Sequence, residues 1–160
     1  MTRKDDLKAE AGSPSTCDRR DAMAVLARAT AEELQAAWDA WSDKPGVETV
    51  RGPETGLVMV RGRIGGGGAP FNFGEATVTR ATVRISTGTV GHAYALGTDR
   101  RKVRHGAVFD ALWQDEATRA HVETGVLDPV RGRLRARSRR RAEETAATRV
   151  DFFTMVRGED

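Results

Sequence analysis

The sequence predicts an α+β fold: a mostly antiparallel sheet with N-terminal helices and a long helix packed on one face. Apolar residues recur every three or four positions before residue 42 and again after residue 102, which is the period of an amphipathic helix. Between these regions, apolar and polar residues alternate with the period of two that is typical of strands. A short Thr-Gly connection inside this strand region favours antiparallel pairing.

The chain of 160 residues is long enough for one domain with its own core. Residues 1–16 are polar and lack the apolar region of a secretory signal, so we expect a disordered tail followed by a single domain over residues 17–160. No segment approaches the roughly 18–20 apolar residues of a membrane helix. The single Cys17 cannot form an internal disulfide, which fits a reducing compartment. We therefore expect a cytoplasmic protein with no membrane partner.

Two helices are expected before the sheet. The first, near residues 18–29, places Met23, Leu26 and Ala27 on one face. Thr30 and Glu33 have the spacing of a capping box and begin the second helix. That helix carries an apolar stripe that must be buried, and KPG at residues 44–46 ends it. The stripe consists of Leu34, Ala37, Trp38 and Trp41.

The first strands are expected on either side of a turn at Pro53–Gly56. The segment before the turn, residues 47–52, is a weak strand. The segment after it alternates, with Val58, Val60 and Ile64 on one face. The other face carries Leu57, Met59, Arg61 and Arg63.

The next two strands form a predicted hairpin with Thr87 and Gly88 as its two-residue loop. In this register Val83 faces His92, and Ala81 faces Tyr94, on the core side. The opposite side carries Arg80 and Arg84 beside a strip of glycine and alanine, which another backbone or a ligand can approach closely.

The C-terminal half is expected to be mainly helical. Thr98 or Asp99 caps a long helix that ends near Gly125, and the arginine-rich segment after it is helical too. The chain closes with a strand over residues 149–157 that has apolar groups on both faces. Such a strand is either central in its own sheet or paired with a partner subunit. Its expected partner contacts are Val150, Phe152, Phe153 and Met155.

Four consecutive glycines, Gly65, Gly66, Gly67 and Gly68, raise the question of phosphate binding. They lack the GKS or GKT ending of a Walker A loop and lead into a strand rather than a helix, which argues against a dinucleotide site. A backbone nest for an anion and a simple hairpin connection both remain open.

The titratable residues form no recognisable active site. The three histidines have no metal-ligand spacing, so no metal is expected, and no catalytic residue is assigned. We expect His92 on the core side, and His105 and His121 on the surface of the long helix. Asp110, like its neighbours Asp115 and Glu116, is expected to be an ordinary surface carboxylate.

Seven arginines lie between Arg131 and Arg141. The favoured interpretation is a solvated helix whose arginines pair with nearby acids or contact an acidic partner. The alternative is a basic nucleic-acid-binding module, which salt-dependent binding to arbitrary duplex DNA would reveal. No aromatic residues are interleaved and no helix-turn-helix is apparent, so nucleic acid ranks lower.

Three segments together resemble one known family. ETGLVMVRGRIGGGGAPFNFGEATVTRATVRI, TGTVGHAYALGTDRRKVRHGAVFDAL and the terminal ATRVDFFTMVRG are similar, in sequence and spacing, to the PhnG subunits of the bacterial carbon–phosphorus lyase system. The resemblance runs from about Met23 to Gly158. The first residues lie outside this resemblance. The resemblance implies no function for the arginine run.

The resemblance implies a subunit of a phosphonate-degrading transferase. In that family the protein acts with H, I and L subunits to transfer a phosphonate to the ribose of MgATP, releasing adenine. The product is an alpha-D-ribose 1-phosphonate 5-triphosphate. The subunit joins H, I and J in a two-fold core assembly, with the I subunit as its chief partner and the usual candidate for catalysis. The isolated chain is therefore expected to be inactive and to bind no cofactor itself. Whether it is then a monomer or self-associates stays open.

The residue pattern and the family resemblance both point to the arginines around the glycine segment as a binding surface. Arg61, Arg63, Arg80 and Arg84 are expected to share one sheet side with Gly65 to Gly68. Guanidinium groups bind phosphonate and phosphate oxygens well. Our hypothesis is that this face borders the substrate pocket or docks the I subunit.

Overall fold

Helices and an antiparallel sheet build the structure, a computed structural model that describes residues 16–63 and 67–148. Helices α1 (Thr16–Arg28) and α2 (Ala31–Asp39) come first, followed by strands β1 (Val47–Gly62), β2 (Phe71–Ile85) and β3 (Val90–Leu96). Helices α3 (Arg100–Gln114) and α4 (Glu116–Val122), the π-helical turn η1 (Glu123–Leu127) and helix α5 (Asp128–Ala147) complete the chain. The predicted α+β class is confirmed. The predicted polar tail and closing strand lie almost entirely outside the described residues.

The N-terminal helices form as predicted. Thr30 Oγ1 accepts a hydrogen bond from the Glu33 backbone N–H at 3.2 Å, and the Glu33 carboxylate accepts one from the Thr30 N–H at 2.8 Å. This is the reciprocal capping box expected from the sequence. Leu34 and Trp41 are buried and Trp38 packs beside them, so the predicted apolar stripe faces the core.

Strand β1 differs from its prediction because it runs without interruption through the expected turn at Pro53–Gly56. The extra residues are absorbed as register shifts between Thr49 and Arg51 and between Arg51 and Glu54. The strand order is β1-β2-β3, so β1 lies at an edge. An edge strand with bulges tolerates Pro53, whose missing N–H need not weaken the ladder.

The β2–β3 hairpin is shifted by one residue from the predicted register. Its loop has three residues, because the Ile85 N–H donates to the Thr89 carbonyl at 3.0 Å and Gly88 adopts a φ of 90°. A three-residue loop with glycine in the left-handed region is a common hairpin solution. Thr82 therefore pairs with His92, and Arg80 with Tyr94. The shift turns these two β3 side chains outward and brings Gly91 to the core side.

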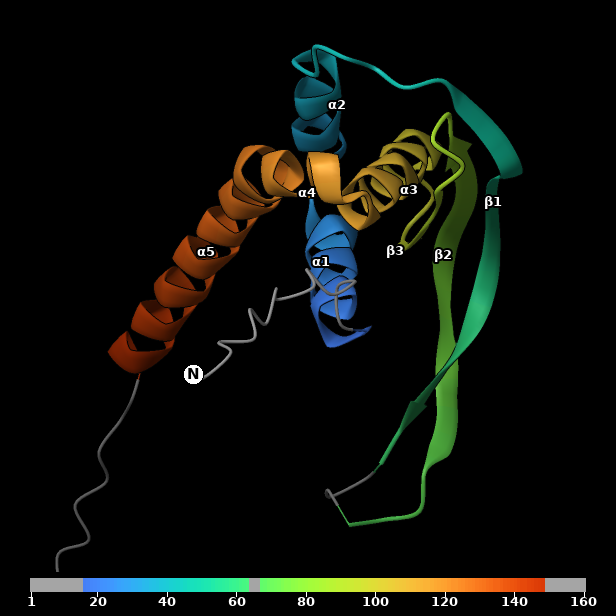
Figure 1. Cartoon of the computed structure of the whole chain (residues 1–160). Coiled ribbons are helices and arrows are strands. Elements are labelled where there is room, and N and C mark those ends of the chain that lie inside the picture. The colour runs from blue at the N-terminus through green and yellow to red at the C-terminus, as the bar shows by residue number, and fades with distance from the viewer. Residues whose placement is uncertain (1–15, 64–66, 149–160) are drawn as a thin grey trace, which may run out of the picture.

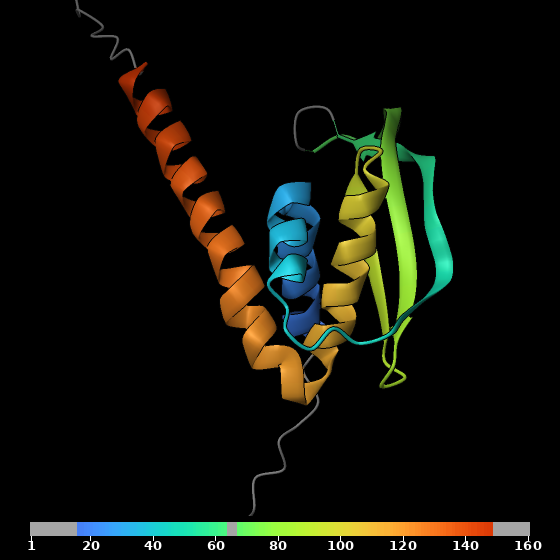
Figure 2. The same cartoon turned by 90° about the horizontal axis from the view of Figure 1, so that it is seen from above.

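Helix α3 covers one face of the sheet, and α1 packs against it on the far side (Figures 1 and 2). The Asp99 side chain caps α3 by accepting from the Lys102 N–H at 2.9 Å, as predicted. Small residues allow the close approach of α3 to β3. A Cβ placed on Gly91 would lie 2.0 Å from the Ala107 carbonyl oxygen and 2.5 Å from the Ala111 nitrogen. The prediction that this glycine lies beside Arg80 and Arg84 is wrong: the register shift places Gly91 on the core side, where the backbone of α3 approaches it.

The predicted helix end near Gly125 is wrong, because the chain continues through η1 into α5. Val122, Leu127 and Val130 are buried at this junction and anchor it to the core. Pro129 occupies the first turn of α5, where a missing N–H costs no helical hydrogen bond. Beyond Leu134 every described residue of α5 is exposed, and the helix projects from the body (Figures 1 and 2). None of the helices described here has the length and apolar character needed to cross a membrane.

Candidate functional site

The sheet face turned away from α3 carries a group of polar and basic side chains that no described helix covers (Figure 2). We call this the outer face and define it by Arg80, Thr82 and Arg84 of β2 with His92 and Tyr94 of β3. Strand pairing brings them together, since Arg80 lies opposite Tyr94 and Thr82 lies opposite His92. Side chains of directly paired residues share one face.

The alternation of burial along β2 defines this face sharply. Ala81 and Val83, which point toward α3, are 2% and 0% exposed. The side chains of Arg80 and Arg84 are 51% and 48% exposed. The two guanidinium groups are therefore held on a rigid central strand while their ends remain in solvent.

Each of these arginines has one carboxylate partner on β1. Arg80 Nε donates to Glu54 Oε1 at 2.8 Å, and Arg84 Nη1 donates to Glu48 Oε2 at 3.2 Å. Arg51 also contacts Glu54 Oε1. Desolvation acts in the opposite direction, but the hydrogen bonds from Arg80 and Arg51 lower the pKa of Glu54 below its ordinary value. Such exposed pairs are weak, so an anionic ligand or an acidic partner can exchange with the glutamates.

His92 occupies the centre of the outer face, which corrects its predicted core position. Its Nδ1 lies 3.0 Å from Thr82 Oγ1, and the two groups share one hydrogen bond. The one-residue register shift is the reason for this placement. A hydroxyl and an imidazole between two arginines form a set of groups suited to phosphate or phosphonate oxygens.

A shallow hollow of about 210 Å³ adjoins this cluster between β1, β2 and β3. Arg80 and Glu54 provide its polar part, while Tyr94, Val58 and the buried Val78 provide apolar surface. A side chain or small group that is polar at one end and apolar at the other would fit this lining.

The arginines predicted to share one sheet side do not all gather here. Arg61 follows Leu57 and Met59 in the alternation of β1, on the side opposite Glu54, the partner of Arg80. Arg63 Nη1 donates to the Gly68 carbonyl at 3.4 Å across the glycine connection.

The structure describes only part of the glycine segment. Gly65 and Gly66 lie outside the described residues, whereas Gly67 and Gly68 lie inside them. The roles predicted for the arginines and these glycines in binding substrate or a partner remain predictions. So do the contacts predicted for Val150, Phe152, Phe153 and Met155, which also lie outside the described residues.

Asp110 is a buried carboxylate that sequence reasoning placed on the surface. It is 1% exposed, and its two oxygens accept hydrogen bonds from Arg19 Nε and Nη2 at 3.0 and 2.8 Å. The His92 backbone N–H donates to the same carboxylate at 2.7 Å. Asp110 thus links α1, α3 and β3 directly behind the outer face. Its position seven residues after Val103, on the apolar stripe of α3, is the signal that could have revealed its burial.

His105 also differs from its predicted surface position. It is 7% exposed and lies beside Trp38, with ring centroids 6.2 Å apart. Burial, followed by the positive charge of Arg104, lowers its pKa. His121 remains exposed as predicted, although its ring contacts Trp41 with centroids 4.5 Å apart.

The arginine run forms the projecting helix α5, as predicted. Arg131 pairs with Glu123 and Asp128, and Arg133 makes a bidentate contact with Glu33. The remaining five, from Arg135 onward, are exposed. Alternate residues of a helix lie about 200° apart, so these arginines point in opposite directions rather than forming one basic face. Salt-dependent DNA binding remains the test of the nucleic-acid alternative.

Within residues 16–63 and 67–148, no group of three or more His, Cys, Asp or Glu side chains is placed to hold a metal ion. The cations, hydroxyl and imidazole of the outer face can bind and orient an anion.

Comparison with known proteins gives two concordant results. The family model described as "Phosphonate metabolism protein PhnG" matches residues 17–158. The "Alpha-D-ribose 1-methylphosphonate 5-triphosphate synthase subunit PhnG" of Rhizobium meliloti (strain 1021) is 68% identical over 142 residues, which cover 89% of this chain and 90% of that protein.

Proposed function

The chain belongs to the PhnG family of phosphonate metabolism proteins, and we propose on this basis that it is a subunit of a cytoplasmic alpha-D-ribose 1-methylphosphonate 5-triphosphate synthase. In the proposed reaction a phosphonate oxygen forms a bond to C1 of the ribose of MgATP. The bond from that carbon to adenine breaks, and adenine leaves with a proton. The proposed partners are the H, I and L subunits for this reaction, with J in the core assembly and I as the chief contact.

The observation that carries this proposal is the outer face. Arg80 and Arg84 stand on one central strand with His92 and Tyr94 beside them, and no described helix covers them. Both proposed substrates, a phosphonate and a nucleoside triphosphate, are strongly anionic. Guanidinium groups bind their oxygens with paired hydrogen bonds, and the adjacent hollow offers apolar surface for the rest of a ligand or for a partner side chain.

In this proposal the chain contributes a binding surface to a site that other subunits complete. Arginine, threonine and histidine side chains on a rigid sheet can hold an anion in one orientation, which is a large part of catalysis of group transfer. The isolated chain is expected to release no adenine. The complete assembly is expected to do so when given MgATP and methylphosphonate.

The test uses the synthase assembled by co-expression with the proposed partners. Arg80→Ala is the informative variant, because its surface ion pair with Glu54 contributes at most about 1 kcal/mol to folding. Arg139→Ala, which removes the same charge from the exposed part of α5, is the matched control. Two quantities are measured: co-purification of the subunits, and adenine release as a function of MgATP and methylphosphonate concentration.

The two roles of the outer face give different results. If Arg80 contacts substrate, the variant assembles normally and its KM for MgATP or methylphosphonate rises by roughly tenfold, the loss expected from one charged hydrogen bond. If Arg80 docks a partner, co-purification fails while the isolated subunit stays folded. Unchanged assembly together with unchanged kinetics would exclude the outer face from both roles. Adenine release by the purified chain alone at the rate of the assembly would refute the proposal of an incomplete site.

A further inference from the structure

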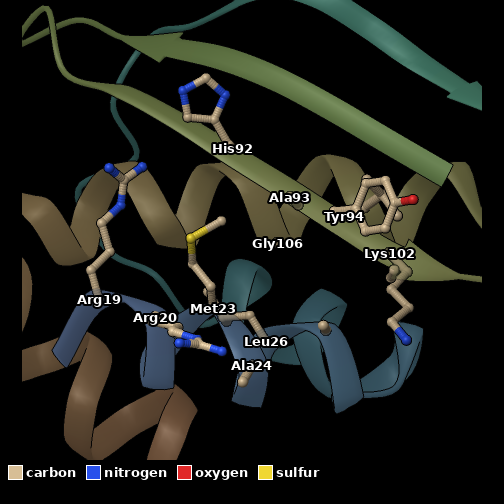
Figure 3. A pocket seen from close by; sticks show the side chains of 13 residues that line it. Arg19, Arg20, Met23, Ala24, Leu26, His92, Ala93, Tyr94, Lys102 and Gly106 are labelled. Atoms are coloured by element: carbon tan, nitrogen blue, oxygen red, sulfur yellow. The ribbon is translucent and has the colours of Figure 1, made fainter. Parts of the chain in front are cut away.

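A second surface lies on the helix side of β3 and adjoins the outer face along this strand. A groove of about 660 Å³ lies between α1, α3 and β3. Figure 3 shows the side chains that line it. Its lining is mainly apolar and includes Met23, Ala27, Val103 and Ala95, with Arg20 and Lys102 at the rim. The groove follows four consecutive residues of β3, from His92 to Ala95. It therefore runs along an edge of the sheet.

No strand among the described residues occupies that edge, because β3 is the last strand of the sheet they form and pairs there with β2 alone. The Ile85 N–H donates to the Thr89 carbonyl, and the Gly97 N–H donates to the Thr77 carbonyl. These two bonds show which residues of β3 direct their backbone groups toward β2. The odd-numbered residues of β3 bond to β2, and the backbone groups of the even-numbered residues point outward. Two outward groups are already capped by α3: the His92 N–H by Asp110, and the Val90 carbonyl by Gln114 at 2.9 Å.

The rest of the edge is open. No described residue pairs with the outward N–H or carbonyl of Tyr94, and Leu96 continues the edge beyond it. Unpaired backbone groups in a row are a template for an added strand. Apolar surface flanks this edge on both sides: Met23 and Val103 line the groove, while Tyr94 and Leu96 on the opposite side are 49% and 73% exposed.

We propose that residues 150–156 of a second copy of this chain add as a strand to this edge. A strand placed there needs apolar side chains on both of its faces. The segment VDFFTMV has them, with Phe152 and Val156 alternating with Phe153 and Met155. Its seven residues would span about 23 Å at roughly 3.3 Å per residue, the same length as the seven residues of β3. The N-terminal segment, residues 1–15, is polar and does not offer this pattern.

The direction and length of α5 favour a strand donated by a second copy over one donated by the same chain. The helix has 20 residues, so it is about 30 Å long, and its described residues from Arg135 onward are exposed. It leaves the body on the side of α1 opposite the sheet (Figures 1 and 2). Only two residues separate Ala147 from Val150, so the segment begins at the far end of this arm with no linker to return it to its own β3. Two copies related by a two-fold axis can exchange these segments, so that each copy covers the β3 edge of the other.

Four proteins test the exchange by light scattering after gel filtration. The full chain is expected at twice the monomer mass, and the chain ending at Thr148 at the monomer mass. Tyr94→Pro is also expected as a monomer, since proline removes an outward N–H and is tolerated at a sheet edge, whereas the matched Tyr94→Thr keeps the N–H and remains a dimer. A full chain that is monomeric at all concentrations, or a truncated chain that stays dimeric, overturns the proposal.

A mixing experiment covers the case in which the proline variant does not fold. Leu96→Cys and Phe153→Cys are prepared separately in a Cys17→Ser background, mixed, and treated with a short bis-maleimide. Heterodimer cross-linking is expected, and its absence contradicts the exchange. If the segment instead cross-links to another subunit in the assembled synthase, the occupant is that subunit and the second-copy proposal fails. None of these readouts involves adenine release, so their outcome is separate from that of the proposed function.

Discussion

Replacing Gly91 with alanine tests the closest contact of the fold, between β3 and α3. The added Cβ would lie 2.0 Å from the Ala107 carbonyl oxygen, 2.5 Å from the Ala111 nitrogen and 2.8 Å from the Ala111 Cβ. Ordinary contacts of a Cβ begin near 3.4 Å. The first two atoms belong to the helix backbone, which cannot rotate away as a flexible side chain can. The strand and the helix must therefore separate by more than an ångström.

The cost follows from the packing at this contact. Ala107 and Ala111 are both 0% exposed, and neighbouring Val83 and Val108 are also fully buried, so a separation opens gaps throughout the centre of the core. Overpacking costs typically about 1–3 kcal/mol, and a clash with backbone belongs at the upper end. At about 3 kcal/mol, the melting temperature of a domain of this size is expected to fall by roughly 6–12 °C.

Thermal and urea unfolding, followed by circular dichroism, measure the effect. Gly74→Ala is the matched control, because Gly74 lies on the same sheet, has no positive φ and has no atom within 4 Å of an added Cβ. The control is expected to change the free energy of unfolding by less than about 0.5 kcal/mol. A Gly91→Ala protein as stable as the control would show that β3 and α3 are not in this close contact, and would refute the reasoning.

Two further predictions concern buried titratable groups. Asp110→Ala leaves Arg19 and the His92 N–H without their shared carboxylate. Because Arg19 is partly exposed and can turn to water, we expect the free energy of unfolding, measured in urea, to fall by about 2–3 kcal/mol. A fall below about 0.5 kcal/mol would contradict a structural role for this link. Burial lowers the pKa of His105, so the unfolded chain binds more protons near and below pH 6.5 and the stability from neutral His105 is lost as pH falls. His105→Phe should therefore weaken the fall in unfolding free energy between pH 7 and pH 5 by comparison with the unchanged chain, and an unchanged pH dependence would count against this assignment.

Short-range patterns of the sequence led to correct predictions where neighbours along the chain decide the structure. The capping box of Thr30 and Glu33 forms because both groups lie within one helical turn. Leu34 and Trp41 are buried because the stripe they share with Trp38 must leave water. Asp99 caps α3 for the same local reason.

The sequence did not decide the length of the β2–β3 loop or the conformation at Pro53, because each has two alternatives that fit the local residues nearly equally well. A Thr-Gly pair fits a two-residue loop, but Ser86 joins it and Gly88 takes the left-handed conformation of a three-residue loop. One residue of shift exchanged the faces of β3, which moved His92 onto the outer face. Pro53 marks a turn in many sequences, yet at a sheet edge it is accommodated by bulges.

The sequence by itself determined the α+β class, the helix caps, the apolar stripes and the family, because these depend on residue types and on spacings within one element. The tertiary structure decided which side chains share the outer face, that Asp110 joins three elements behind it, and that the groove edge of β3 pairs with no other described strand. These features join residues far apart in the chain, such as Arg19 and Asp110, and depend on strand register and on the packing of α1 and α3. A one-residue shift in pairing leaves the local pattern almost unchanged but reverses every side chain of a strand, so only the packed structure distinguishes the alternatives.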